Sequence, residues 1–332
     1  MKRIPIGAWR VARTGLLVAV LVVALGAGLA GCRKSAPIPP YESFMPADVD
    51  KAPKTEFECE LVGTIEPKVG ALRGIAVDAG DHVYAVGSGG LRVLDAEGRE
   101  LKTWKVPEDV QAVAVAQDGT VYVGVTASVL KFDRDGKPLG SWGSEGPGPG
   151  ELRRVTSVAV AGSNVFVADA RNLCIHRFNA EGVFVNEIGK RDNKTDFLGI
   201  IAPSPYLDFV IDKDQQVIVG NPGRLRVETY TADGKLLSFW GEPGLAPEQF
   251  CGCCNPTNLA LTRAGLLVTS EKGIPRVKVY DRTGKLLAYI PPKMFSPAAA
   301  GMDLAVDSKD RIYVAEPVTG RILVFEMKKA GE

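Results

Sequence analysis

The feature that most constrains this chain is a unit of four short β-prone runs that recurs along it. In the first copy the runs are residues 74–77, 83–86, 91–94 and 101–104, with a turn at Glu97-Gly98 before the last run. The unit returns every roughly 40 to 50 residues, a period typical of repeat architectures. The first runs of the later copies are residues 112–115, 157–160, 209–212, 259–262 and 304–307.

A four-stranded sheet cannot bury both of its faces by itself, so we expect such units to pack side by side around a closed ring. The last copy supplies only three runs, which end at residues 322–326. The segment FECELVGTI (57–65) precedes the first copy and is β-prone, so it is expected to pair with the last unit and cover its open edge. The prediction is an all-β, six-bladed β-propeller over residues 55–328, with four antiparallel strands per blade and closure by the N-terminal strand.

The repeats also resemble a known family. An Ala-Val-Asp run, a Val-Tyr-Val run, a V-x-V-F/Y-D run and a final G-K-x-L-x-x-W-G are similar to the NHL repeat. WGSEGPGPGEL (142–152) and WGEPGLAPEQF (240–250) resemble the loops between its blades. The likeness covers residues 57–327. It implies the fold and says little about activity, since NHL propellers include binding scaffolds, RNA-binding modules and one amidating lyase.

The N-terminus has the form of an export signal. Basic residues between positions 2 and 13 precede an uncharged apolar run at 15–31. The run ends in Leu29-Ala30-Gly31-Cys32, which resembles the lipobox of bacterial lipoproteins. That resemblance implies cleavage after residue 31 and acylation of Cys32, which would hold the mature protein on a membrane. The alternative is a retained transmembrane helix, because the run is nearly long enough to span a bilayer.

Residues 32–54 are rich in proline and polar side chains, which is typical of an extended, weakly ordered tether. The expected location is the bacterial cell envelope, on a membrane. In a Gram-negative cell an Asp after the lipidated Cys would suggest retention in the inner membrane. This chain has Arg33 there, so the resemblance favours the outer membrane.

Charge and motifs narrow the function classes. Lys+Arg 40 against Asp+Glu 39 argues against a nucleic-acid binder, which needs a basic face to displace counterions from phosphates. The chain has no G-x-S-x-G, H-E-x-x-H or P-loop sequence, so the common hydrolase and phosphate-binding signatures are absent.

Strand order assigns loops to faces of the ring. Loops between second and third strands should share one face with the loops between blades, while the Asp-x-x-Gly and Asp/Glu-Gly turns lie on the opposite face and look structural. Polar residues gather on the first face, which we predict to be the binding face. They are Asp169, Arg171, Asn172, Arg224, Glu271, Lys272, Arg276, Glu316 and Arg321.

The segment Phe250-Cys251-Gly252-Cys253-Cys254-Asn255-Pro256 belongs to the same face and is the sharpest functional clue. Its three thiols could form a disulfide, bind a soft metal such as copper or zinc, or stay free. The string Gly-Cys-Cys-Asn-Pro is similar to uncharacterised bacterial propeller lipoproteins, with no known activity attached. Outside it, Cys59 and Cys174 are expected to be small buried residues of strands.

Other metal chemistry has weaker support in the sequence. The amidating lyase of this fold uses a His-rich zinc site, whereas this chain has two scattered histidines. His82 is expected at the surface in a turn, and His176 in a third strand as a packed or surface residue. Calcium in the central channel, as in lactonase-type propellers, would use Asp169, Asn172 and Asn258.

The sequence therefore favours a non-catalytic scaffold that binds a protein, peptide or glycan. Two alternatives stay open: a metal-dependent enzyme of lactonase or lyase type, and a thiol-based metal or redox protein using Cys251, Cys253 and Cys254.

Overall fold

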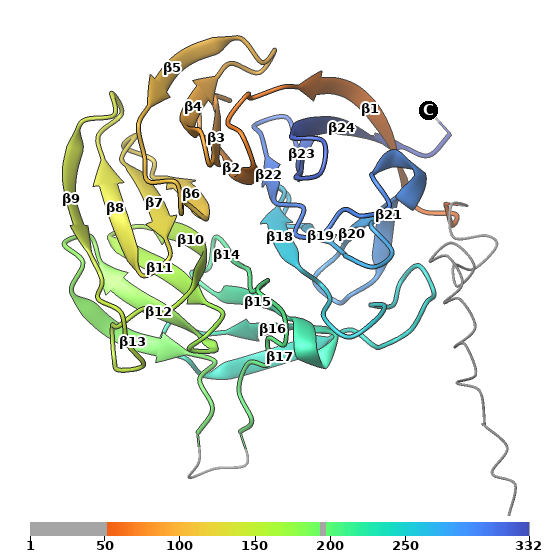
Figure 1. Ribbon diagram of the computed structural model, residues 1–332. Coiled ribbons are helices and arrows are strands. Elements are labelled where there is room, and N and C mark those ends of the chain that lie inside the picture. Colours follow the sequence, from red (N-terminus) through yellow and green to blue (C-terminus); the bar gives the residue numbers. More distant parts are fainter. Residues whose placement is uncertain (1–51, 193–196, 332) are drawn as a thin grey trace, which may run out of the picture. The chain divides into compact units, whose positions relative to one another are not determined.

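The computed structural model describes residues 52–192 and 197–331 of the 332-residue chain. Within these residues the strands form six four-stranded sheets around a central axis, so the predicted six-bladed β-propeller is confirmed (Figure 1). The signal peptide predicted at 1–31, Cys32 and most of the predicted tether lie outside the described residues.

The blades are numbered 1 to 6 in chain order, and each runs from its innermost to its outermost strand. Blade 1 is β2 (Leu72–Val77), β3 (Val83–Gly87), β4 (Gly90–Leu94) and β5 (Glu100–Trp104); blade 2 is β6 (Ala112–Val115), β7 (Val121–Val125), β8 (Ser128–Phe132) and β9 (Pro138–Trp142). Blade 3 is β10 (Val155–Ala161), β11 (Asn164–Asp169), β12 (Cys174–Asn179) and β13 (Phe184–Ile188); blade 4 is β14 (Phe209–Ile211), β15 (Val217–Asn221), β16 (Arg226–Tyr230) and β17 (Leu236–Trp240). Blade 5 is β18 (Asn258–Leu261), β19 (Leu267–Ser270), β20 (Val277–Tyr280) and β21 (Leu286–Ile290); blade 6 is β22 (Leu304–Val306), β23 (Ile312–Glu316), β24 (Arg321–Lys329) and β1 (Phe57–Ile65).

In the described residues, helical structure is limited to short turns. Pro222–Arg224 and Pro292–Met294 each form one turn of 3-10 helix. No helix in the described part of the chain is long and apolar enough to cross a membrane.

The ring closes as the sequence predicts. Strand β1 lies at the outer edge of blade 6 and pairs antiparallel with β24, from Phe57 opposite Lys329 to Ile65 opposite Ile322. The two ends of the propeller sequence therefore share one sheet, and backbone hydrogen bonds join them. A sheet edge that would otherwise be open to another chain is covered.

Apolar side chains fill the seams between neighbouring sheets. In the described residues each seam has its own buried cluster, including the seam between blades 6 and 1, where Ile65, Leu72, Tyr313 and Ile322 meet. Each sheet thus buries its two faces against its two neighbours, which a single blade could not do.

The outer strands lock onto the following blade. Trp104 at the end of β5 packs against Gly136 in the last turn of blade 2, where φ is +85° and a Cβ would lie 2.5 Å from the indole. Gly136 is therefore required for both its backbone conformation and its closeness to the ring. Ile65 takes the place of the tryptophan at the closing seam, where it faces Gly98 of blade 1.

This packing makes closure a testable source of stability. Ile65 is 4% exposed, while Leu61 on the same strand is 41% exposed. We expect Ile65→Ala to lower the free energy of unfolding by about 2–4 kcal/mol, because it leaves a cavity in the closing seam. Leu61→Ala is the matched control and should cost less than about 1 kcal/mol. Denaturant unfolding of the two variants measures this, and equal losses would contradict a closing seam at Ile65.

Candidate functional site

The loop face is the side of the ring formed by the loops between second and third strands and by the segments between blades. Because neighbouring strands are antiparallel, both kinds of connection emerge on the same side. The opposite side carries the turns between first and second strands and the Asp-x-x-Gly turns between third and fourth strands. In the first of these turns in blade 1, the Asp78 side chain accepts hydrogen bonds from the backbone N–H groups of Gly80 and His82. These turns are structural, as expected. His82 lies in one of them, with Nδ1 3.0 Å from Asp78 Oδ2.

Several residues predicted for the loop face belong to its loops but have buried side chains. Asp169 is fully buried and accepts hydrogen bonds from the backbone N–H groups of Arg153, Arg154, Arg171 and Asn172. Asn172 donates from Nδ2 to the carbonyl oxygens of Gly146 and Glu151, both at 3.0 Å. Glu316 is also buried, and its carboxylate accepts hydrogen bonds from the backbone of Val318 and Thr319. These side chains hold the loops in place and are not available to a partner.

Blade 5 carries a buried ionic cluster at the same level. Glu271 accepts a hydrogen bond from the backbone N–H of Cys251 and pairs with Arg276 and Lys278. Arg276 Nη2 and Lys278 Nζ each donate to the carbonyl oxygen of Gln249 at 2.8 Å, which ties the loop between blades 4 and 5 to the sheet. Burial alone would raise the pKa of Glu271, but the two cations outweigh it and lower that pKa. Burial lowers the pKa of Lys278 to about 8, against the opposing effect of Glu271.

The remaining predicted residues are accessible. Arg171 and Arg321 are exposed, while Arg224 and Lys272 are half-buried. The ammonium group of Lys272 lies 5.5 Å from the centre of the Tyr206 ring, within the range of a cation–π contact. The loop face therefore offers cationic groups to a partner, while the buried carboxylates below them serve the fold.

A cavity of ≈ 270 Å3 opens at the mouth of the channel on the loop face. Its polar lining consists of Arg73, Gln111, Arg154, Thr156, Tyr206 and Asn258, of which Asn258 alone was among the candidates drawn from the sequence. Arg73 and Arg154 are exposed. Arg73 is the second residue of β2, the inner strand of blade 1, and Arg154 directly precedes β10, the inner strand of blade 3. The cationic groups therefore stand over one part of the ring.

Acidic residues stand on the other part. When the copies of the repeat are aligned, the same position near the start of the inner strand holds a carboxylate or an amide in blades 4, 5 and 6. These residues are Asp208, Asn258 and Asp303. The blades are joined at this level: Asp208 Oδ2 accepts a hydrogen bond from the N–H of Leu259, and Asp303 Oδ2 from the N–H of Ile75, each at 2.7 Å. Asn258 Nδ2 donates to Asp303 Oδ1 at 3.3 Å.

These carboxyl groups hold their protons unusually strongly. Burial raises the pKa of Asp208 to about 6, and burial together with the charge of Asp208 raises the pKa of Asp303 to about 7. Between them, Asn258 Oδ1 is buried and has no hydrogen-bond partner. The arrangement can hold a proton, and its oxygen donors are of the kind that a hard cation such as calcium takes.

The calcium alternative drawn from the sequence needs a correction of its residues. Only Asn258 of its three residues lies on the channel. Asp169 and Asn172 belong to the second strand of blade 3 and the loop that follows it, where both are hydrogen-bonded to neighbouring loops. Asp208 and Asp303 are the carboxylates that accompany Asn258. Aligning the copies of the repeat would have found them, since they occupy the same position as Asn258.

The cysteine loop lies beside the mouth. Asn255 pins it to blade 5: its side chain donates to the carbonyl oxygens of Cys251 and Lys272 and accepts from the N–H of Lys272. The cysteines in the described residues are free thiols. Cys253 Sγ lies 3.3 Å from Cys254 Sγ, well beyond a bond of about 2.05 Å, so the disulfide considered for this loop is not formed in the structure.

The cysteines differ in how accessible they are. Cys253 is exposed, whereas Cys251 and Cys254 are buried. Burial raises the pKa of Cys251 to about 11 and also raises that of Cys254, so both keep their protons near neutral pH. Cys59 lies half-buried in β1, where burial raises its pKa to about 12.

Comparison with known proteins supports the fold. No protein-family model matches the chain, and no curated protein does. Among solved structures, the WD40 β-propeller domain of Doa1 is 13% identical with a TM-score of 0.56, over 82% of this chain and 98% of that chain. Virginiamycin B lyase from Staphylococcus aureus is 11% identical (TM-score 0.57, 81% and 99%), and a streptogramin B lyase is 12% identical (TM-score 0.54, 83% and 100%). At these identities the likeness establishes a propeller and no activity.

The raised pKa values predict how stability depends on pH. A carboxyl group with a raised pKa stabilises the fold below its unfolded pKa, about 4, and this contribution is lost as the pH rises through about 7. Asp303→Asn removes the charge and keeps an oxygen to accept from the N–H of Ile75. Its amide NH2 then faces Asn258, whose side-chain amide can turn over to accept from it through Oδ1. We therefore expect this variant to be about 1–2 kcal/mol more stable than the parent at pH 8, with little difference at pH 5.

Denaturant unfolding in the presence of a chelator, at pH 5 and pH 8, measures the difference between the two proteins. Burial lowers the pKa of His176, so this residue makes the fold more stable as the pH rises, opposite to Asp303. Because His176 is present in both proteins, its effect cancels when their stabilities are subtracted. Glu181→Gln, at an exposed turn, is the control and should change neither value. If Asp303→Asn is less stable than the parent at pH 8, the raised pKa assigned to Asp303 is contradicted.

Proposed function

We propose that this chain is a non-catalytic binding protein of the bacterial cell envelope, held on a membrane through Cys32, that captures a protein, peptide or glycan on its loop face. The observation that carries the proposal is the polar cavity at the mouth of the channel, with Arg73 and Arg154 exposed at its rim. Guanidinium groups donate several hydrogen bonds in a fixed geometry, which suits carboxylates and other oxygen-rich groups.

The rigidity of the loop face supports this function. Asp169, Glu271 and Glu316 are buried and hydrogen-bonded to the loops around them, so the loops need little ordering when a partner binds. Tyr206, next to Lys272, adds a flat apolar surface of the kind that sugar rings and peptide side chains pack against. A preformed, polar and partly aromatic hollow fits a binding site better than a mobile surface would.

The composition of the mouth favours binding over catalysis. Its lining in the described residues contains no Ser, Cys or Lys nucleophile with a base beside it. Of the three solved structures compared above, two are lyases and one is a WD40 domain, so the propeller fold by itself does not decide between an enzyme and another role. In this chain a cationic rim stands over a hydrogen-bonded ring of inner-strand residues.

The anchor and the tether complete the proposal. Acylation at Cys32 would hold the mature chain on a bilayer, and the proline-rich residues 33–54 would separate the propeller from it. In a Gram-negative cell we propose the outer membrane. Tethered in this way, the loop face can meet partners that are part of the envelope.

Binding at the mouth predicts a face-specific effect of arginine substitutions. Arg73→Ala with Arg154→Ala should reduce capture of an envelope partner at least 10-fold in a cross-linking and affinity experiment, because it removes the rim donors. Arg134→Ala, on a turn of the opposite face, is the matched control and should leave capture unchanged. Equal capture by all of these proteins would refute binding at the mouth, and turnover of a defined substrate would refute a non-catalytic role.

Anchoring is tested separately. Cys32→Ser should abolish incorporation of a fatty-acid label and move the protein from the membrane fraction to the soluble fraction. Cys59→Ser, a cysteine within the propeller, should retain both label and location. Membrane retention of the Cys32→Ser protein with its N-terminal residues still attached would support the transmembrane alternative instead.

A further inference from the structure

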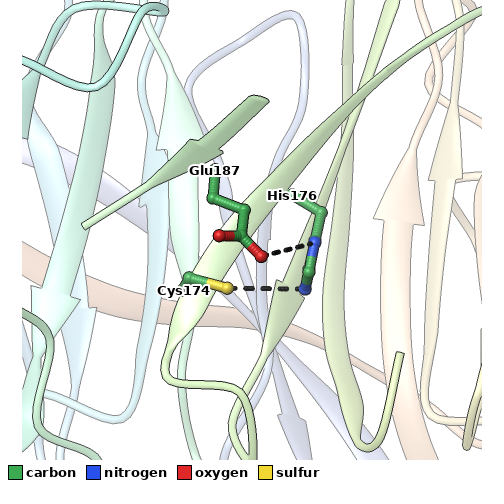
Figure 2. Close-up of side chains that lie close together, drawn as sticks. All are labelled: Cys174, His176 and Glu187. Atoms are coloured by element: carbon green, nitrogen blue, oxygen red, sulfur yellow. Dashed lines mark hydrogen bonds and ion pairs between the residues drawn. The ribbon is translucent and has the colours of Figure 1, made fainter. Parts of the chain in front are cut away.

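Blade 3 contains a cluster of side chains that the mouth does not use. Cys174 and His176 are two positions apart on β12, so they lie on the same face of the sheet. Glu187 lies on β13 directly opposite His176 in the strand register. Figure 2 shows the thiol and the carboxylate both directed at the imidazole ring.

The three side chains are close enough to share one ion. Cys174 Sγ lies 3.4 Å from His176 Nε2, and Glu187 Oε1 lies 3.8 Å from His176 Nδ1. One donor atom from each residue can be chosen so that all lie within 4.8 Å of one another. Sulfur and nitrogen ligands of a tetrahedral zinc ion lie about 3.5 Å apart, given bonds of about 2.3 and 2.0 Å. Glu187 approaches the other ring nitrogen, so its carboxylate must rotate to reach an ion held between Cys174 Sγ and His176 Nε2.

The imidazole in this cluster is unsatisfied. The side chain of His176 is fully buried, and its Nδ1 has no hydrogen-bond partner. A buried polar atom without a partner has lost its hydrogen bonds to water and gained none in return, so such atoms are uncommon in folded proteins. The orphaned nitrogen is on the Glu187 side of the ring, whereas Nε2 is on the Cys174 side, so an ion on either nitrogen would fix the proton on the other.

Blade 5 shows how the same positions are filled when they are purely structural. There Arg276 occupies the place of Cys174, Lys278 that of His176 and Tyr289 that of Glu187. Arg276 and Lys278 are paired with Glu271 and bonded to the neighbouring loop. Blade 3 thus replaces a compensated ion cluster with a thiol, an imidazole and a carboxylate, which are the three main donor groups of zinc.

We propose that Cys174, His176 and Glu187 bind one zinc ion inside blade 3. The donor set distinguishes the metal: thiolate and imidazole ligands suit zinc, whereas calcium and magnesium take oxygen ligands. On binding, the ion replaces the thiol proton of Cys174, which passes to solvent. The fourth coordination position is left to a water molecule.

The surroundings provide a supporting carboxylate and a path for the ion. Asp169 Oδ2 lies 3.9 Å from His176 Nε2 but is already bonded to the N–H of Arg153 and to Nδ2 of Asn172. It therefore stays a loop cap beside the site and is not counted as a ligand. Glu187 lies on the outermost strand with its side chain 15% exposed and paired with Lys190, so an ion can enter from the rim. Asp169 also fixes the loop before β12. The proposed zinc site therefore lies directly beside a residue that holds a loop of the loop face in place.

The test uses the mature protein in detergent, stripped with a chelator and dialysed against zinc or cobalt. Elemental analysis should find one zinc ion per chain, and cobalt should produce a thiolate-to-metal charge-transfer band. His176→Gln and Cys174→Ser should each lower zinc content at least 10-fold and abolish the band. Glu187→Gln, at the partly exposed position, should weaken zinc binding at least 10-fold. Circular dichroism should show that all of these variants fold.

The competing site is the cysteine loop, so the control is a protein with Cys251, Cys253 and Cys254 all replaced by Ser. This protein should keep one zinc ion and the cobalt band. The proposal is overturned if the parent binds no stoichiometric zinc, if zinc survives both His176→Gln and Cys174→Ser, or if the loop control loses it. Uptake of copper with exclusion of zinc would also overturn the assignment of the metal.

Discussion

The structure depends on the apolar seams between sheets, because no blade can bury its two faces alone. Each seam needs a neighbour on both sides, and only a closed ring gives every sheet two neighbours. Strand β1 meets this requirement by completing blade 6 and placing Ile65 in the seam with blade 1. With the ring closed, the inner strands are held at a fixed spacing, and the polar positions at their ends are brought into a defined circle.

Repetition made the fold predictable from sequence. The strand runs, the blade count and the closing role of 57–65 all followed from the copies, and the structure confirms them. The roles of individual polar residues did not follow as easily. Asp169, Glu271 and Glu316 occur where a surface carboxylate would also occur, at the end of a strand before a loop. Only the path of the loop shows that their oxygens face backbone N–H groups and not solvent.

The groupings that the sequence did not reveal share a different property, since their residues meet through register or ring closure. Asp208, Asn258 and Asp303 are about fifty residues apart in sequence but occupy the same position in successive blades. His176 and Glu187 are joined by the turn at Asn179 and Val183, which sets the pairing of β12 with β13. A one-residue change in that turn would place Glu187 on the opposite face of the sheet. The sequence shows which side chains are present, but the strand register determines which of them lie in contact.

The same repetition explains why the mouth of the channel is polarised. A perfectly repeated ring would carry one residue type at each level and present no direction to a ligand. Here the inner position is small in blades 1 and 2, as Gly74 and Ala112, and acidic or amide in blades 4 to 6, as Asp208, Asn258 and Asp303. Arg73 and Arg154 stand over blades 1 and 3. A partner at the mouth therefore meets cationic donors over blades 1 and 3, while the carboxyl groups of Asp208 and Asp303 line the central channel on the side of blades 4 and 6. This asymmetry favours one orientation of a bound polar group.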